Sequence, residues 1–182
     1  MKSQLYLSVV VCLLSACASA PKIDYYTLAM EPSGQARPTV NLAVERLQTT
    51  EALGRSQILI STSSTEVDYY ATDLWAGSVG ELVQQKLAVE FGPPVEGRRT
   101  LKVSGTVLAF EQVDVGGEAE GRVKLQIEVR DAASKQYEKP LLEKTYEVSR
   151  SASMPSAAAV VVALSECIEQ IAAEIATDLW SP

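Results

Sequence analysis

The chain contains no histidine, and this absence removes several classes of catalytic chemistry. Without an imidazole there is no Ser-His-Asp triad, no Cys-His pair, no histidine metal site and no histidine general base. The short motifs of nucleotide-binding, esterase, zinc-protease and thiol-redox sites are also missing. We therefore predict that the protein is not an enzyme and has no catalytic residue, metal site or cofactor. Paired carboxylates stay open as an alternative, because their separation is set in three dimensions.

Basic residues are scarce as well, with 16 Lys and Arg against 23 Asp and Glu and a formal net charge of −7. Affinity for nucleic acid rests on clustered Lys and Arg that neutralise phosphates, so we predict no nucleic-acid partner. Hydrophobic residues make up 47% of the 182 residues and charged residues 21%. This composition and length are typical of one globular domain and not of a disordered chain.

The longest uncharged apolar run near the N-terminus, residues 5–14, is too short to span a membrane. At about 1.5 Å per residue it covers roughly 15 Å, half of a hydrocarbon core of roughly 30 Å. Lys2 precedes the run and small residues follow it, which is typical of a secretory signal peptide. We predict that residues 1–16 are a lipoprotein signal peptide.

The four residues Leu14-Ser15-Ala16-Cys17 resemble a bacterial lipobox. The resemblance implies cleavage before Cys17 and acylation of its sulfur and its new α-amine. The alternative is an ordinary signal peptide cut after Ala20, at an A-x-A site. A cysteine that carries two or three acyl chains is a lasting membrane anchor.

The residue after Cys17 is Ala18 and not aspartate, which resembles lipoproteins sorted to the outer membrane of diderm bacteria. We predict a protein that is anchored by lipid to the outer membrane and faces the periplasm. Because the chain is acidic, we expect lipid and not the protein surface to make the membrane contact.

Cysteine pairing is simple under this prediction. Cys12 leaves with the signal peptide and Cys17 carries lipid, so Cys167 is the thiol that remains and no intramolecular disulfide forms. Its neighbours Leu164 and Ile168 lie at helical spacing, which favours a buried small hydrophobe over a reactive or intermolecular thiol.

The mature chain divides into two parts. Residues 17–38 contain the lipidated cysteine, a tether with several prolines and a short strand at residues 23–28. Residues 39–182 form a single globular α+β domain that ends in a long helix. Alternating apolar residues predict a strand at residues 40–45 and a hairpin around the turn at residues 61–64.

Two segments have helical periodicity. The first carries apolar residues three or four apart from Trp75 to Phe91, with Asp73 as its N-cap and Gly92 as its stop. The second begins after Pro155 and carries an apolar stripe to Leu179. Polar residues off this stripe are expected to face solvent: Glu166, Glu169, Gln170, Glu174 and Asp178.

Three segments with a period of two predict a long antiparallel meander, at residues 101–109, 123–129 and 142–148, with a hairpin turn at Gly116-Gly117. The sheet and the two amphipathic helices each have an apolar face to bury. We therefore predict an α+β fold, a two-layer sandwich in which a mostly antiparallel sheet is covered on one face by the two helices.

Aromatic residues cluster at Tyr69, Tyr70 and Trp75, and we treat these three as candidate contacts for a partner protein. Strand alternation places Tyr69 and Tyr70 on opposite faces, so one of them faces solvent or a partner. Trp75 lies on an apolar helical stripe, where a core position is the more common outcome than a binding hot spot.

In its order of features the chain resembles the ABC-type transport auxiliary lipoprotein family. A lipobox, an early Tyr-Tyr-x-Leu segment, an Arg-x-x-Ile stretch, a Tyr followed by Trp-Ala, a strand meander and a terminal Ile-Ala-x-x-Leu occur in that order. The residues concerned are Tyr25, Tyr26, Leu28, Arg55, Ile58, Tyr70, Trp75, Ala76, Leu82, Ile175, Ala176 and Leu179. The chain departs from the family pattern in Gly77, where an acidic residue or proline is expected after Trp-Ala.

The resemblance implies a lipoprotein that works with a mammalian cell entry (MCE) domain protein and an ABC permease and ATPase. Such a system moves phospholipid or another hydrophobic molecule between membranes, and the lipoprotein would tether or dock the MCE partner. Two alternatives stay open: a carrier that itself binds lipid, which needs a sizeable apolar cavity, and a structural lipoprotein of another envelope assembly. The sequence leaves open whether the protein forms a homo-oligomer.

Overall fold

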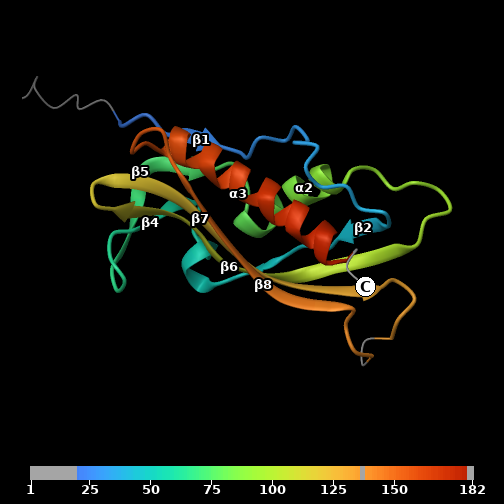
Figure 1. Cartoon of the computed structure of the whole chain (residues 1–182). Helices are drawn as coiled ribbons and strands as arrows, with labels where there is room; N and C mark the ends of the chain where they lie inside the picture. The colour runs from blue at the N-terminus through green and yellow to red at the C-terminus, as the bar shows by residue number, and fades with distance from the viewer. Residues whose placement is uncertain (1–19, 136–137, 180–182) are drawn as a thin grey trace, which may run out of the picture.

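The long strand β6 lies at the centre of the sheet, where β2, β3, β4 and β7 pair with it. The computed structural model describes residues 20–135 and 138–179. The elements in chain order are β1 (Asp24–Tyr26), β2 (Asn41–Val44), β3 (Gln48–Thr49), the 3-10 helix η1 (Glu51–Gly54), β4 (Gln57–Ser61), β5 (Val67–Trp75), α2 (Val79–Phe91), β6 (Thr100–Val115), β7 (Glu118–Asp131), β8 (Leu142–Ser151) and α3 (Ala157–Asp178). All eight strands belong to one sheet (Figure 1).

The two edges of β6 are paired in different ways. One edge pairs antiparallel with β7 along its length, and β7 pairs antiparallel with β8. The other edge pairs in parallel with β2, β3 and β4 in turn. The predicted meander and the predicted hairpin of β4 and β5 are confirmed. The short parallel pairings make the sheet mixed, while its longest pairings are antiparallel.

The strands of the meander form where apolar and polar residues alternate in the sequence. Along β7, buried residues such as Val123 and Leu125 alternate with partly exposed ones such as Arg122 and Lys124. Gly116 and Gly117 join β6 to β7 with φ values of 60° and 93°. A two-residue hairpin turn with positive φ at both positions matches the twist of the strands, and glycine adopts it without strain.

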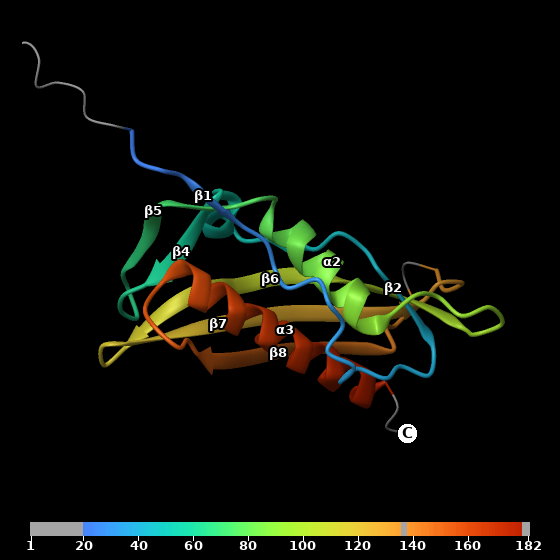
Figure 2. The same ribbon diagram turned by 90° about the horizontal axis from the view of Figure 1, so that it is seen from above.

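Both helices cover the same face of the sheet, so the predicted two-layer α+β fold is confirmed (Figures 1 and 2). The helix α3 lies over β7 and β8. Val123 and Leu125 from the sheet and Ile168 and Ile171 from α3 are all 0% exposed. Burial of apolar side chains such as these provides the main driving force for folding. No helix in the described parts of the chain has the length and apolar character needed to cross a bilayer.

The start of the first helix differs from the sequence prediction. The helix α2 begins at Val79 after the N-cap Ser78, and Trp75 is the last residue of β5. The Trp75 amide donates to the Ser56 carbonyl at 2.7 Å, and the Ala76 amide donates to the Tyr26 carbonyl at 2.8 Å. Pairing with chain segments far away in the sequence therefore overrides the helical spacing of Trp75 and Val79. The predicted stop at Gly92 is confirmed.

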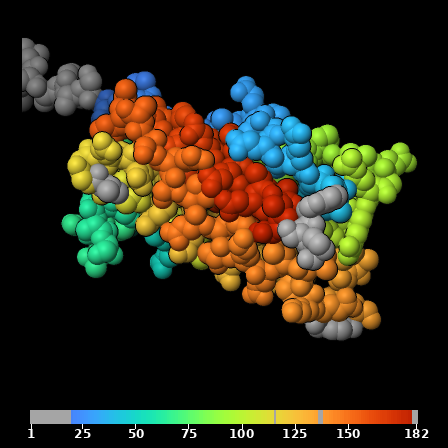
Figure 3. Space-filling model, viewed as in Figure 1, coloured from blue at the N-terminus to red at the C-terminus, as the bar shows by residue number. Residues whose placement is uncertain are grey.

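A segment that we name the strap, residues 27–38, joins β1 to β2 and runs between α2 and α3 (Figure 2). Leu28 and Ala36 of the strap are buried in the core. The Ala29 amide donates to Ser165 Oγ on α3 at 3.1 Å. Figure 3 shows the strap on the surface beside the red residues of α3. The strap therefore belongs to the same layer as the two helices.

Candidate anchoring and docking surfaces

Strand directions divide the domain into two ends. One end, named here the N-terminal end, holds the start of β1, the β4–β5 turn, the β6–β7 turn and the β8–α3 loop. The opposite end, named the distal end, holds the loop at residues 92–99 and the described residues 132–135 and 138–141. The predicted lipidation site Cys17 lies outside the described residues. The first described residue is Ala20, so the chain enters the domain at the N-terminal end (Figure 1).

Tyr69 lies on the face of the sheet that α2 and α3 leave uncovered, which we name the open face. Its hydroxyl donates to the Ala52 carbonyl in η1 at 3.0 Å. The Arg55 guanidinium lies over its ring, 4.7 Å from the ring centre. The ring is half-buried and Arg55 is exposed. This arrangement holds a tyrosine and an arginine together at the surface.

Tyr70 points to the other face of the sheet. Its hydroxyl donates to Gln112 Oε1 at 2.6 Å, and Gln112 Nε2 donates to Asp114 Oδ1 at 2.7 Å. Gln112 is opposite Gly121 in the register, at a place where a Cβ would lie 3.0 Å from the backbone of α3. Burial and then the nearby carboxylates raise the pKa of Tyr70. Tyr69 and Tyr70 therefore lie on opposite faces, as strand alternation predicts.

Trp75 lies in the core. Its side chain is 4% exposed and packs on Phe110, with the ring centres 5.1 Å apart. It offers a partner almost no surface. The structure therefore separates the three aromatic candidates, with Tyr69 on the open face, Tyr70 on the helical side and Trp75 inside.

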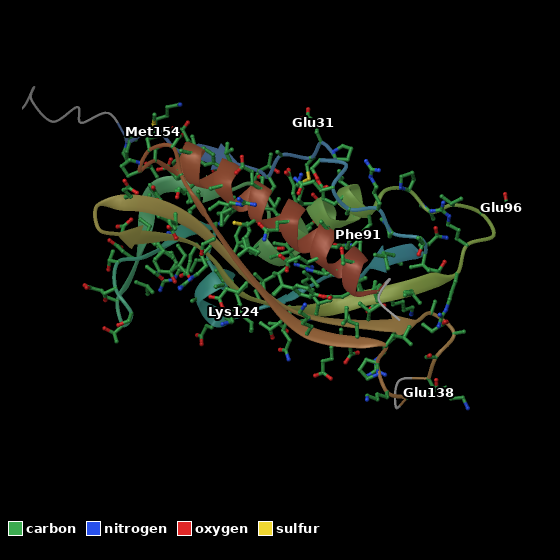
Figure 4. All side chains as sticks on the ribbon, viewed as in Figure 1. Glu31, Phe91, Glu96, Lys124, Glu138 and Met154 are labelled. Carbon is green, nitrogen blue, oxygen red and sulfur yellow. The ribbon has the colours of Figure 1, made fainter. Side chains whose placement is uncertain are left out.

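Ion pairs between neighbouring strands cover the open face. Arg122 on β7 pairs with Glu111 on β6 at 2.6 Å, and Glu111 also accepts a hydrogen bond from Ser61 Oγ at 2.6 Å. Lys124 on β7 pairs with Glu147 on β8 at 2.8 Å. Figure 4 shows Lys124 on the side of the sheet away from the helices. Since the two signs alternate, this face presents no broad field of one sign.

A buried ionic cluster, which the sequence analysis missed, joins the strap to both helices. Lys86 Nζ on α2 donates to Glu90 Oε1 and to Glu169 Oε1, each at 2.7 Å, and to the Glu31 carbonyl of the strap at 3.0 Å. The Lys86 and Glu90 side chains are 0% exposed. The sequence did contain a signal for this cluster, because Lys86 and Glu90 follow Leu82 at the helical spacing of the buried stripe.

Glu90 also holds the strap directly. The Ser33 amide and hydroxyl both donate to its carboxylate, the hydroxyl at 2.5 Å. Burial by itself raises the pKa of the Glu90 carboxyl, but the hydrogen bonds from Lys86 and Ser33 outweigh burial and hold the pKa below its usual value.

The expectation that Glu169 faces solvent is wrong, because its side chain is only 17% exposed and pairs with Lys86.

The end of α3 is tied to β8 by a second polar group. Asp178 Oδ2 accepts hydrogen bonds from Lys144 Nζ and from the Tyr146 hydroxyl, each at 2.7 Å. These two bonds lower the pKa of Asp178, whereas burial and then the Asp178 carboxylate raise the pKa of Tyr146. Asp178 therefore serves as a structural acceptor and is not simply solvated.

Cys167 is buried, as the apolar pattern around it predicts. The side chain is 0% exposed and its thiol donates to the Gly121 carbonyl at 3.4 Å. Burial raises the pKa of the thiol to about 12, so the reactive thiolate is scarce at neutral pH.

Two hollows on the surface of the domain are lined mostly by polar and charged residues. A hollow of about 340 Å³ on the open face is lined by residues that include Lys102, Glu128 and Arg130. Another, of about 540 Å³, lies by the β4–β5 turn and includes Glu66 and Arg122. Within residues 20–135 and 138–179, no three acidic or cysteine side chains gather in a way that could hold a metal ion.

Solved structures share this fold. The crystal structure of protein XCC0632 from Xanthomonas campestris aligns with a TM-score of 0.66 at 18% identity, over 85% of this chain and 92% of that one. The crystal structure of an uncharacterized protein aligns with a TM-score of 0.66 at 16% identity, over 86% and 98% of the two chains. At these identities the likeness concerns the fold, a mixed sheet with two helices on one face.

The family is shown by sequence. Residues 26–176 match the model of a family described as the ABC-type transport auxiliary lipoprotein component. The chain belongs to this family, as its resemblance in sequence predicts. Its class is therefore that of a lipoprotein associated with an ABC-type transport system. No protein with a curated description matches the chain in sequence.

Proposed function

We propose that the protein is a periplasmic lipoprotein, anchored to the outer membrane by acyl chains on Cys17, that tethers or docks the MCE-domain protein of an ABC transporter for phospholipid or another hydrophobic molecule. The family match over residues 26–176 carries the part of this proposal that concerns a lipoprotein of an ABC-type transport system. The MCE partner is implied by the resemblance in sequence, and the outer-membrane location by Ala18 after Cys17. The sequence Leu14-Ser15-Ala16-Cys17 supplies the anchor just ahead of the domain.

The packing of the domain favours docking over lipid carriage. A carrier needs an enclosed apolar cavity for acyl chains. Here the contact between sheet and helices is filled by side chains that are 0% exposed, among them Ile127 and Ile171. The two surface hollows are lined mostly by polar and charged residues. The domain is therefore suited to hold a protein partner.

The pair of Tyr69 and Arg55 is the best supported docking point on the open face. Tyrosine and arginine are enriched among residues that dominate binding energy, and here the ring and the guanidinium are already in contact at 4.7 Å. A surface that is organised before binding loses less conformational entropy when it binds. Tyr70 borders the helical side, and Trp75 contributes by holding β5 on the core.

Co-purification of a detergent-solubilised, tagged full chain with the MCE-domain protein tests the docking function. Tyr69→Ala and Arg55→Ala should each weaken binding roughly tenfold or more, as expected for a hot spot. Thr145→Ala, at an exposed position of β8, is the matched control and should bind like the wild type. Equal binding by all four proteins would exclude this docking point, and no binding by any of them would favour a structural role in another assembly.

Replacement of Cys17 by serine tests the anchor. We expect the variant to leave the outer-membrane fraction and to produce a lipid phenotype in the envelope, while mass spectrometry of the wild type shows acyl chains on Cys17. Retained outer-membrane fractionation with an unaltered envelope would reject the proposal.

A further inference from the structure

Exposed apolar side chains occur at the N-terminal end of the domain, on β1 at one edge of the sheet and in the loop that follows β8 at the other edge. Ile23 and Tyr25 at β1 are 49% and 67% exposed, and Met154 in the β8–α3 loop is 59% exposed. Val162 near the start of α3 is 57% exposed. Figures 1 and 2 show β1 and the start of α3 at the same end, and Figure 4 shows Met154 there. Several large exposed apolar groups at one end of a domain make that end a candidate contact surface.

This region also carries little charge. Residues 151–165, which form the end of β8, the following loop and the first turns of α3, contain no charged side chain. The charges next to Ile23 belong to Lys22 and Asp24, which pair with each other at 2.5 Å. Acidic residues of the same end, such as Glu66 and Glu118, lie instead in the β4–β5 turn and next to the β6–β7 turn. The apolar and acidic parts of the end are therefore separate.

The number of residues between Cys17 and β1 limits how far this surface can lie from the membrane. Ile23 lies six positions after Cys17 in the sequence. At about 3.3–3.6 Å per residue, even a fully extended segment keeps Ile23 within roughly 20 Å of an acylated Cys17. The headgroup layer on each side of a bilayer is several ångström thick. The proposed anchor thus keeps a lipid surface close to this end.

We propose that the apolar part of the N-terminal end, formed by β1 and the β8–α3 loop, rests on the bilayer, with Ile23, Tyr25 and Met154 in the headgroup layer. The inference rests on the proposed acylation of Cys17. Tyrosine favours this layer because its ring is apolar and its hydroxyl stays hydrated. The contact is apolar and needs no attraction of opposite charges, so the acidic net charge of the chain does not oppose it. It differs from the expectation drawn from the sequence, which assigned the membrane contact to lipid alone.

The contact orients the domain. The sixteen residues of β6 run between the two ends and span about 50 Å at roughly 3.3 Å per residue. With the N-terminal end on the membrane, the strands lead away from it and the distal loops reach up to about 50 Å into the periplasm. The open face with Tyr69 then stands sideways to the membrane, where a partner can approach it.

Fluorescent labels at the two ends test the orientation in the acylated mature protein. Cys167 is buried and Cys17 is acylated, so an introduced cysteine is the reactive one. Tyr25→Cys and Met154→Cys report on the N-terminal end, and Val95→Cys and Leu141→Cys are matched exposed positions at the distal end. Each labelled protein is reconstituted in vesicles of phosphatidylethanolamine and phosphatidylglycerol that carry a nitroxide in the headgroup layer.

We expect the nitroxide to quench labels at positions 25 and 154 several-fold more strongly than labels at positions 95 and 141. Equal quenching at all four positions, in proteins that float with the vesicles, would overturn the docked orientation and leave the anchor intact. Failure of the proteins to float would overturn both. A label at position 25 that is shielded from water but not quenched would assign the patch to a second protein and overturn the inference.

A second variant tests the apolar side chains themselves. Ile23→Ser with Tyr25→Ser, in the Met154→Cys protein, should reduce quenching at position 154 several-fold while the protein still floats. The control pair Val95→Ser with Leu141→Ser should leave quenching at position 154 unchanged. Unchanged quenching in the first pair would show that these side chains do not hold the domain on the membrane.

Discussion

Replacement of Lys86 by methionine is the most direct test of the ionic cluster under the strap. Methionine keeps most of the side-chain volume but removes the ammonium group that contacts Glu90, Glu169 and the Glu31 carbonyl. Glu90 is 0% exposed and would keep Ser33 as its donor without a cation. Removal of one partner from a buried pair costs about 3–5 kcal/mol, because the other charge stays buried.

We expect Lys86→Met to lower the free energy of unfolding by about 3 kcal/mol at neutral pH, the low end of that range, since Glu169 is partly exposed and can hydrate. For a domain of this size that loss lowers Tm by roughly 6–12 °C. Urea unfolding followed by the fluorescence of the buried Trp75 measures the change. Lys102→Met is the control, because Lys102 and Glu45 are each 53% exposed and 3.6 Å apart, and such pairs contribute about 0–1 kcal/mol.

The pH dependence separates the ionic effect from packing. The pKa of Glu90 in the folded wild type is below the ordinary 4.5, so its stabilisation is present above pH 4.5 and is lost as the pH falls through the folded value. Without Lys86, we expect burial to raise the pKa of Glu90. Protonation of Glu90 then removes the unpaired buried charge, and the variant loses less stability as the pH falls. The difference between the two proteins should therefore shrink toward pH 4. A difference below about 1 kcal/mol at neutral pH, or one that is independent of pH, would refute the reasoning.

Two further predictions follow from close packing. A Cβ at Gly105 on β6 would lie 2.0 Å from the Gln126 carbonyl oxygen of β7, so Gly105→Ala should lower the free energy of unfolding in urea by about 3 kcal/mol. Gly54→Ala has open space and should change it by less than about 0.5 kcal/mol, and equal effects would contradict the clash. Cys167 should react with a thiol reagent only in unfolded protein, at a rate that rises with urea; rapid labelling of native protein at neutral pH would show that the thiol is accessible.

Local periodicity was sufficient to predict much of the fold. Alternation along residues 118–131 predicts β7, because every second side chain of a strand faces the same side. The paired glycines at 116 and 117 predict the turn. The apolar stripe after Pro155 predicts α3, whose N-cap Ser156 accepts a hydrogen bond from the Ala159 amide. Each of these signals lies within a few residues along the chain.

Contacts between distant segments account for what the sequence did not reveal. Trp75 and Val79 have helical spacing, yet Trp75 is held in β5 by Ser56 and by the pairing of β1. The parallel pairing of β2, β3 and β4 along one edge of β6 carries no local signal. Of the aromatic site candidates, only their packing shows that Tyr69 reaches the surface of the open face while Trp75 is enclosed.

The amino-acid sequence alone determined the absence of histidine chemistry, the resemblance of residues 14–17 to a lipobox, the alternating strands and the apolar helix stripes, because each depends on residue types at short spacing. Only the tertiary structure decided that Lys86 meets Glu169, 83 residues away, and that the strap closes over both. It also decided that Ile23 and Met154 share one end of the domain. Such contacts depend on how the sheet and helices pack together, and no spacing along the chain specifies that packing.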